Sequence, residues 1–333
     1  MARQSSQAEA QTRRALDGAA IRAVLRRAVR AEPPWLHLEV ARRMGERLRV
    51  IRLQPQWLID WWGFTGAGAS ALASAYPKAR RTVVEPTLEL AERSRAAAQS
   101  PWWSAQRWRG AGVEVVHDVA DTPAGLPNPP NLRNPPNPQS VPSVPSLPEG
   151  APLIWSNMML HAHADPPALF ARWHGLLQTD GFVMFSCLGP GTLLELRRLY
   201  ARLGWPTPAA EFVDMHDLGD MLVHAGFADP VLDQETLTLH WASAQDLLAE
   251  LRGLGANAAP ARFAGLRTPR WRSRLLRELE SLAGPDGRLR LSFEVAYGHA
   301  FKAPPRVRAD APTSVSLADM RAMVRSRNTA GKT

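Results

Sequence analysis

The stretch LIDWWGFTGAGAS, residues 58–70, joins a short apolar run to a turn rich in small residues. An apolar run that ends near an acid, here Asp60, and continues into glycines is typical of the first strand and turn of a nucleotide-binding α/β unit. The glycines follow a GxxGxG spacing and are Gly63, Gly66 and Gly68. Dinucleotide-binding turns use GxGxxG, so this spacing does not favour a nicotinamide cofactor. Trp62 and Phe64 place large side chains where such a turn usually has none.

Short apolar runs alternate with amphipathic segments around this turn. The runs cover residues 57–60, 82–85, 113–117, 153–156 and 182–187. The segments with helical periodicity cover residues 68–76, 87–98, 165–177 and 192–203. Strands that are apolar throughout, rather than at every second residue, are typical of a parallel sheet covered on both faces. The residue pattern therefore predicts an open α/β sheet with helices on both faces.

Segments on either side of these runs extend the prediction. A helix is expected after Pro33, because apolar residues recur every four positions up to Leu48, just before the first strand. Further along, Asp214 suits a helix N-cap and Gly226 suits a helix end. The remaining expected elements are a strand at 231–240, helices near 244–253 and 269–282, and a last strand at 289–301.

Composition predicts the boundaries of the folded part. Residues 1–30 form a predicted N-terminal extension, partly disordered, because the first twenty are polar and lack a firm apolar period. Residues 31–302 form the predicted domain. Within it, residues 123–150 are a proline-rich insertion, predicted to be disordered because proline removes backbone donors and cannot join a sheet. Residues 303–333 form a predicted disordered basic tail.

Charge and cysteine content narrow the functional classes. The 333 residues carry a net charge of +9, and nearly all of the positive charge comes from arginine. These arginines are spread along the chain without a basic run interleaved with aromatic residues, which favours an acidic protein partner over nucleic acid. A single cysteine, Cys187, excludes an intrachain disulfide and any CxxC site. No segment approaches the about 20 apolar residues of a membrane span, so a cytoplasmic protein without membrane attachment is expected.

Polar side chains end several of the expected strands, where open α/β sheets bind their ligands. Asp60 ends the first strand and Glu85 the second, at the position where an acid accepts both hydroxyls of a ribose. Asp118 follows the third strand and suits an adenine amine or the loop backbone, and Asn157 lies at the same edge. Helix capping or loop hydrogen bonding is the alternative interpretation for each acid.

Common catalytic and metal motifs are missing from the sequence. Neither a P-loop nor a GxSxG nucleophile turn occurs. His161 and His163 form HxH without a third ligand at metal spacing, so no metal site is predicted. Since no acid, base or nucleophile constellation emerges, the catalytic residues are unknown at this point.

Motifs in the second half of the chain point to a family. They are FVMFSCLGPGTLLELR from residue 182, FVDMHDLGDMLVHAGFADPVLDQETLTLHW from residue 212, and FEVAYGHAF at 293–301. In order and spacing these closely resemble the malonyl-acyl-carrier-protein O-methyltransferases of biotin synthesis, from about residue 32 to residue 301 apart from the insertion. The resemblance implies a Rossmann-like, seven-stranded methyltransferase sheet, mostly parallel with an antiparallel last strand. It also implies S-adenosylmethionine as the cofactor.

The resemblance implies methyl transfer to the free carboxylate of a malonyl thioester on acyl carrier protein. A carboxylate is ionised at neutral pH, so the reaction needs positioning and exclusion of water more than a general base. Acyl carrier proteins are acidic, and an arginine-rich surface favours encounter with them. The arginines between residues 262 and 277 are a candidate for that surface, with a solvated helix face as the alternative.

The family motif D-x-G-x-G-x-G, laid on Asp60, aligns its three glycines with Trp62, Phe64 and Gly66. Glu85 and Asp118 match the family's ribose-side and adenine-side acids in position. The predicted cofactor site comprises Asp60, Gly63, Gly66, Glu85, Asp118 and Asn157. An alternative hypothesis, motivated by the two aromatic residues, is a catalytically impaired methyltransferase-like protein with a binding or regulatory role. A third hypothesis is methylation of another acid or carrier, and the sequence leaves the oligomeric state open.

Overall fold

The computed structural model describes residues 15–98, 112–118, 150–255 and 257–304. The predicted disorder of residues 1–14, of the proline-rich insertion up to residue 149 and of the tail from residue 305 concerns segments outside the described residues. The described residues up to Lys302 belong to one compact unit. No helix among the described residues is long and apolar enough to cross a membrane.

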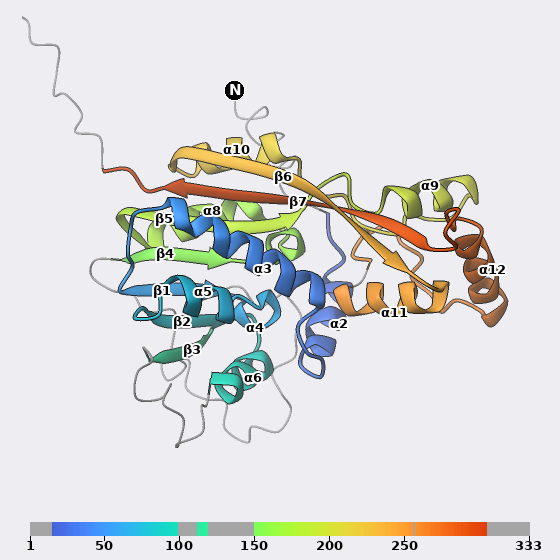
Figure 1. Ribbon diagram of the computed structural model, residues 1–333, viewed down its shortest axis with the longest axis horizontal. Helices are drawn as coiled ribbons and strands as arrows, with labels where there is room; N and C mark the ends of the chain where they lie inside the picture. Colours follow the sequence, from blue (N-terminus) through green and yellow to red (C-terminus); the bar gives the residue numbers. More distant parts are fainter. Residues whose placement is uncertain (1–14, 99–111, 119–149, 256, 305–333) are drawn as a thin grey trace, which may run out of the picture. The chain divides into compact units, whose positions relative to one another are not determined.

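A seven-stranded sheet in the order β3-β2-β1-β4-β5-β7-β6 forms the centre of the unit (Figure 1). Its strands are β1 Trp57–Trp61, β2 Arg80–Glu85, β3 Val113–His117, β4 Ala151–Ser156, β5 Leu177–Leu188, β6 Ala228–Trp241 and β7 Leu289–Phe301. Strands β1 to β5 pair in parallel, and β7 runs antiparallel to both of its neighbours, β5 and β6. The prediction of a mostly parallel sheet with an antiparallel last strand is confirmed.

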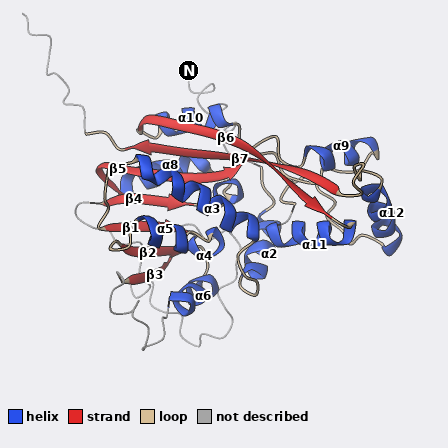
Figure 2. Cartoon of the chain, in the orientation of Figure 1, coloured by secondary structure: helices blue, strands red, loops and turns tan. Residues whose placement is uncertain are grey.

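Helices cover both faces of the sheet (Figure 2). Successive strand residues point to opposite faces, so Ile59 belongs to one hydrophobic cluster and its neighbour Leu58 to the other. The first cluster includes residues of α2 Gly18–Ala28, α6 Leu88–Ala98, α8 Pro166–Leu176 and α10 Met215–His224. The second includes residues of α3 Trp35–Arg47, α5 Ala69–Ala75, α9 Leu194–Arg202, α11 Ala244–Leu254 and α12 Pro269–Glu280. Short helical turns are η1 Leu48–Val50, α4 Gly63–Gly66 and η3 Leu160–Ala162.

Helix α2, which lies within the predicted N-terminal extension, packs into the folded core. Its Ile21 and Leu25 are buried in the first hydrophobic cluster. Asp17 caps the helix, and its backbone N–H donates to the carbonyl of Ala258 at 2.7 Å. The side chain of Asp17 also forms an ion pair with Arg262 at 2.5 Å. The sequence concealed this helix because its apolar stripe is short and lies among arginines.

Strands β6 and β7 continue beyond the rest of the sheet as a two-stranded ribbon. Strand β5 pairs only with residues 295–301 of β7, whereas β6 pairs with β7 from Leu289 onward. Helix α11 follows directly after the outer end of β6. The ribbon thereby places α11 next to α2, and Arg27 of α2 donates a hydrogen bond to the carbonyl of Gly255 at 3.2 Å.

Candidate functional site

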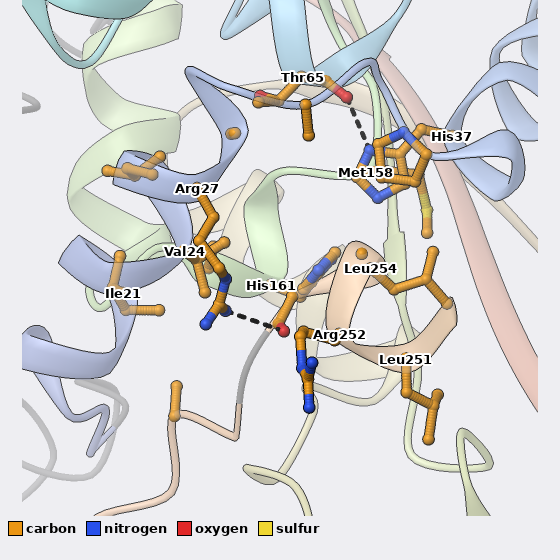
Figure 3. Close-up of a pocket in the computed structure, with 18 of the residues that line it drawn as sticks. Ile21, Val24, Arg27, His37, Thr65, Met158, His161, Leu251, Arg252 and Leu254 are labelled. Atoms are coloured by element: carbon orange, nitrogen blue, oxygen red, sulfur yellow. Dashed lines mark hydrogen bonds between the residues drawn. The ribbon is translucent and has the colours of Figure 1, made fainter. Parts of the chain in front are cut away.

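A cavity of about 1320 Å³ lies at the carboxyl ends of the central strands (Figure 3). Its lining includes Trp62 and Thr65 after β1, Thr87 after β2, Met158 after β4 and Leu188 at the end of β5. Helices α2 and α11 supply much of the remaining wall, and α3 contributes His37. This is the edge at which open α/β sheets bind ligands. The volume exceeds the roughly 300–1,000 Å³ of an ordinary small-molecule pocket, so it suffices for a cofactor together with part of a second molecule.

The turn after β1 keeps a glycine-like backbone although its first glycine position is Trp62. Trp62 has φ 54° and ψ 46°, which is the left-handed region. That conformation costs a bulky residue about 1 kcal/mol or more. The backbone N–H of Trp62 donates to the carbonyl of Val84 at 2.6 Å, and its side chain is 2% exposed within the first hydrophobic cluster. Burial of the indole therefore stabilises a conformation that glycine would adopt without strain.

The glycines of this turn are required by close packing. A Cβ on Gly63 would lie 2.7 Å from Cγ of Asp60 and 2.8 Å from Cγ1 of Val83. On Gly66 it would lie 3.0 Å from the carbonyl oxygen of Asn157. Gly63 and Gly66 are both buried, and neither lines the cavity. Their structural role is to let the turn press against β2 and β4.

Replacing Gly63 with alanine is expected to lower the free energy of unfolding by about 1.5 kcal/mol, because the new methyl group overpacks a buried site. Gly175 in α8 is a matched control, since a Cβ there would meet no atom within 4 Å. At that helical position, Gly175→Ala is expected to stabilise the protein by about 0.5–1 kcal/mol. Urea unfolding of both variants measures the difference. Equal effects of the two substitutions would contradict the packing argument.

The carboxylate of Glu85 is held by the turn itself. Its Oε1 accepts hydrogen bonds from the backbone N–H of Phe64 at 2.7 Å and from the hydroxyl of Ser94 at 2.6 Å. Its Oε2 is buried and has no hydrogen-bond partner among the described residues. Glu85 is 0% exposed, and burial raises the pKa of its carboxyl to about 8. The predicted ribose ligand thus holds the turn, and Phe64, which lines the cavity, is bonded to it.

The two other predicted acids are buried and paired with arginines. Asp60 lies 3.6 Å from Nη1 of Arg81, and burial raises its pKa to about 6, an effect that the arginine opposes. Asp118 forms an ion pair with Arg172, whose guanidinium lies 4.9 Å from the ring centre of Trp61. The structure thus brings both acids to the predicted sheet edge and gives each a partner within the protein.

Asn157 connects four elements through a buried hydrogen-bond network. Its Nδ2 donates to the carbonyl of His37 at 2.8 Å and to the carbonyl of Gly66 at 2.5 Å. The hydroxyl of Ser186 donates to its Oδ1 at 2.7 Å. Burial lowers the pKa of His37 to about 4, so this histidine is neutral and its Nδ1–H donates to the carbonyl of Thr65 at 2.7 Å. The network links α3, the turn after β1, β4 and β5.

Comparison with known proteins shows the family. No family model matches the chain. Malonyl-acyl-carrier-protein O-methyltransferase of Gallionella capsiferriformans is 36% identical over 276 residues, covering 83% of this chain and 87% of the relative. The Laribacter hongkongensis protein of the same name is 33% identical over 277 residues, covering 82% of this chain and 84% of the relative. The chain belongs to the malonyl-acyl-carrier-protein O-methyltransferase family.

Solved structures overlap the chain more loosely. The YcgJ protein of Bacillus subtilis has a TM-score of 0.47 at 12% identity, covering 78% of this methyltransferase-family chain and 98% of the other. That similarity supports no inference about function. The recognition from the motifs in the second half is confirmed by the relatives, whereas the six predicted cofactor residues stay a prediction.

The cavity of this methyltransferase-family protein is lined by residues that the sequence did not single out. Prominent among them are Arg27 of α2 and Arg252 of α11. His161, considered above only as a metal ligand, lies in η3, lines the cavity and contacts the ring of Phe212 edge-on, with centroids 5.9 Å apart. Within the described part of the chain, no group of three or more His, Cys, Asp or Glu residues could hold a metal ion. The sequence signal that could have predicted α2 was the helical spacing of its apolar residues, Ile21 and Leu25, next to Arg27.

Proposed function

We propose that this protein transfers a methyl group from S-adenosylmethionine to the free carboxylate of a malonyl thioester on acyl carrier protein, early in biotin synthesis. The observation that carries the proposal is the large cavity at the carboxyl ends of the strands in a chain of this family. The relatives' name supports the substrate. We place the reaction in the cytoplasm, which the presence of a single, buried cysteine, Cys187, supports.

Bound S-adenosylmethionine supplies a methyl group on a positively charged sulfur, ready for in-line attack. The chain has to position the substrate carboxylate and keep water out, because that carboxylate is already ionised at neutral pH. Apolar side chains of Trp62, Met158 and Met159 line the floor of the cavity and exclude water there. No residue needs to remove a proton, which agrees with the missing catalytic base.

The residues at the strand ends fit the cofactor in chemistry. Glu85 Oε2 is a buried carboxyl oxygen without a hydrogen-bond partner among the described residues, at the strand end expected for the ribose acid. Thr65, Thr87 and Glu89 add polar groups to the adjoining cavity wall. We propose that Glu85 holds the ribose, supported by Asp60, Asp118 and Asn157 at the same edge. Because Glu85 is fully buried and bonded to Phe64, the side chain of Phe64 limits access to it.

Replacing Phe64 with glycine is expected to tighten S-adenosylmethionine binding about tenfold, equivalent to about 1.4 kcal/mol. The substitution removes the ring that lines the cavity but keeps the backbone N–H that holds Glu85. Phe212→Gly is the matched control, because Phe212 also lines the cavity but contacts His161 instead of the β1 turn or Glu85. Calorimetric titration gives both dissociation constants. Unchanged or weaker binding in a folded Phe64→Gly protein would show that the ring does not limit access.

Methyl transfer to malonyl-loaded carrier protein tests the proposed function directly. Mass spectrometry should detect the methyl ester on malonyl carrier and none on acetyl carrier, which lacks a free carboxylate. Absence of cofactor binding at millimolar concentration would overturn the proposal in favour of the impaired alternative. Turnover on another acid alone would favour the third hypothesis. The open cavity supports the enzyme, whereas the burial of Glu85 beside Phe64, outside the cavity lining, is the feature on which the impaired alternative rests.

A further inference from the structure

Exposed arginines gather at one side of the cavity, where α2 faces the end of α11. They are Arg26, Arg27, Arg30 and Arg252, and all of them line the cavity. Arg27 uses one N–H to bind the carbonyl of Gly255 at 3.2 Å, which holds its guanidinium between the two helices. Figure 3 shows the side chains of Arg27 and Arg252 extending into the same space. A guanidinium has five N–H donors, so most of the donors of each arginine stay available to a ligand.

Among the described residues, no carboxylate forms an ion pair with these four arginines. Glu32 and Glu89 are the acids that line the cavity, and Glu32 is paired with Arg93 at 3.2 Å. Elsewhere arginines have acidic partners, such as Arg43 with Glu235 at 2.6 Å. The cavity mouth therefore carries uncompensated positive charge, which attracts an anionic ligand.

An apolar passage leads inward from these arginines. Ile21 and Val24 line it from α2, and Leu251 and Leu254 line it from α11 (Figure 3). The passage continues to the floor of the cavity near His161. A ligand that fits has an anionic group at its outer end and a long, mostly uncharged chain.

We propose that Arg27 and Arg252 bind the phosphodiester of the pantetheine arm that carries the malonyl group. The arm then passes between α2 and α11, and the malonyl carboxylate reaches the cavity floor. This inference rests on the proposed function, because it assumes that an acyl carrier protein delivers the substrate. Arginine suits the role, since its planar fork binds phosphate oxygens in pairs and stays charged at all relevant pH values. Arg26 and Arg30 face the acidic carrier surface on the same side.

The arginines of α12 form the alternative candidate surface for binding the carrier protein. Helix α12 and the loop before it carry the arginines between 262 and 277 that were expected to attract the carrier. None of these arginines lines the cavity. Arg262 is engaged with Asp17, and Arg267 stacks on Phe263 with its guanidinium 3.8 Å from the ring centre. Arg270 and Arg272 are exposed on α12 and have no ion pair with a described residue. They provide a control that removes the same charge outside the cavity.

The experiment compares Arg27→Ala/Arg252→Ala with Arg270→Ala/Arg272→Ala. Methyl transfer is measured on malonyl-loaded carrier protein and on malonyl N-acetylcysteamine, a thioester without the phosphate. The first double variant is expected to raise KM for the carrier at least tenfold and to leave the small thioester unchanged. Arg270→Ala/Arg272→Ala is expected to change KM by less than twofold, both for the carrier and for the small thioester. Arg27→Lys/Arg252→Lys, which keeps the charge but loses the planar fork, should recover only part of the carrier affinity.

Two results would overturn the phosphate site. One is an equal loss in both double variants, which would mean general attraction instead of a local contact. The other is an equal loss on the carrier and on the small thioester, which would mean damage to the cavity. If the wild-type protein methylates neither substrate, the proposed function fails. The inference is then tested separately by comparing the affinity of the protein for holo carrier protein, which has the pantetheine arm, with its affinity for apo carrier protein, which lacks it. Carrier binding that needs neither the arm nor Arg27 and Arg252 would then refute it.

Discussion

Replacing Asn157 with alanine is expected to lower the free energy of unfolding by about 4 kcal/mol. The substitution leaves the carbonyls of His37 and Gly66 and the hydroxyl of Ser186 without their present partner. Each unsatisfied buried group costs about 1–3 kcal/mol, and the lost side-chain volume adds a cavity. Chemical denaturation, with the cofactor absent, measures the effect.

Ser186→Ala provides the comparison for Asn157. Its hydroxyl donates to Asn157 and accepts from the backbone N–H of Met158 at 3.0 Å, so a smaller loss of about 1.5 kcal/mol is expected. If Asn157 acted only as a cofactor ligand, its alanine variant would keep the stability of the wild type and lose cofactor affinity. That outcome would contradict the role of Asn157 in holding the turn.

Between pH 6.5 and pH 8 the free energy of unfolding is expected to fall by about 2 kcal/mol because of Glu85. The folded protein raises the pKa of this carboxyl from 4.5 to about 8. In this range the unfolded chain has lost the Glu85 proton and the folded protein retains it, so rising pH favours unfolding. Urea unfolding at several pH values gives the slope.

Other buried groups titrate mainly below this window. Asp60, with a pKa raised to about 6, lowers stability as pH rises, and its change is nearly complete at pH 6.5. His37, with a pKa lowered from 6.5 to about 4, raises stability with pH, and the last part of its change falls inside the window because the unfolded imidazole is half protonated at pH 6.5. Glu85→Gln keeps an acceptor for Phe64 and Ser94 without a titrating proton, so the fall in stability between pH 6.5 and pH 8 should disappear. The same slope in this variant and in the wild type would show that another group titrates.

The sheet was predictable because its buried strands correspond to short apolar runs in the sequence. The runs that became β1 to β5 are apolar throughout, as expected of strands covered on both faces. Helix caps were also local signals: Asp214 accepts a hydrogen bond from the N–H of His216 at 2.8 Å, and α10 begins where the sequence placed it. The motifs near the last strand identified the family because they are long and specific.

The site was less predictable because its contacts depend on tertiary packing. The positions of Glu85 and Asn157 at strand ends follow from the sequence, but their partners lie in a turn and in α3 that only folding brings close. The arginines at the cavity mouth were not predicted, since Arg27 and Arg252 lie far apart in the chain and face each other only when the β6–β7 ribbon places α11 beside α2.

The left-handed Trp62 has a consequence for finding related proteins. Glycine is usually read as the mark of this turn, yet here a buried indole maintains the same backbone angles. A left-handed turn residue can therefore occur where the glycine pattern is absent from the sequence. Searches keyed to glycine spacing will pass over such chains, whereas searches keyed to the strand-end acids and to the motifs of the last strands will retrieve them.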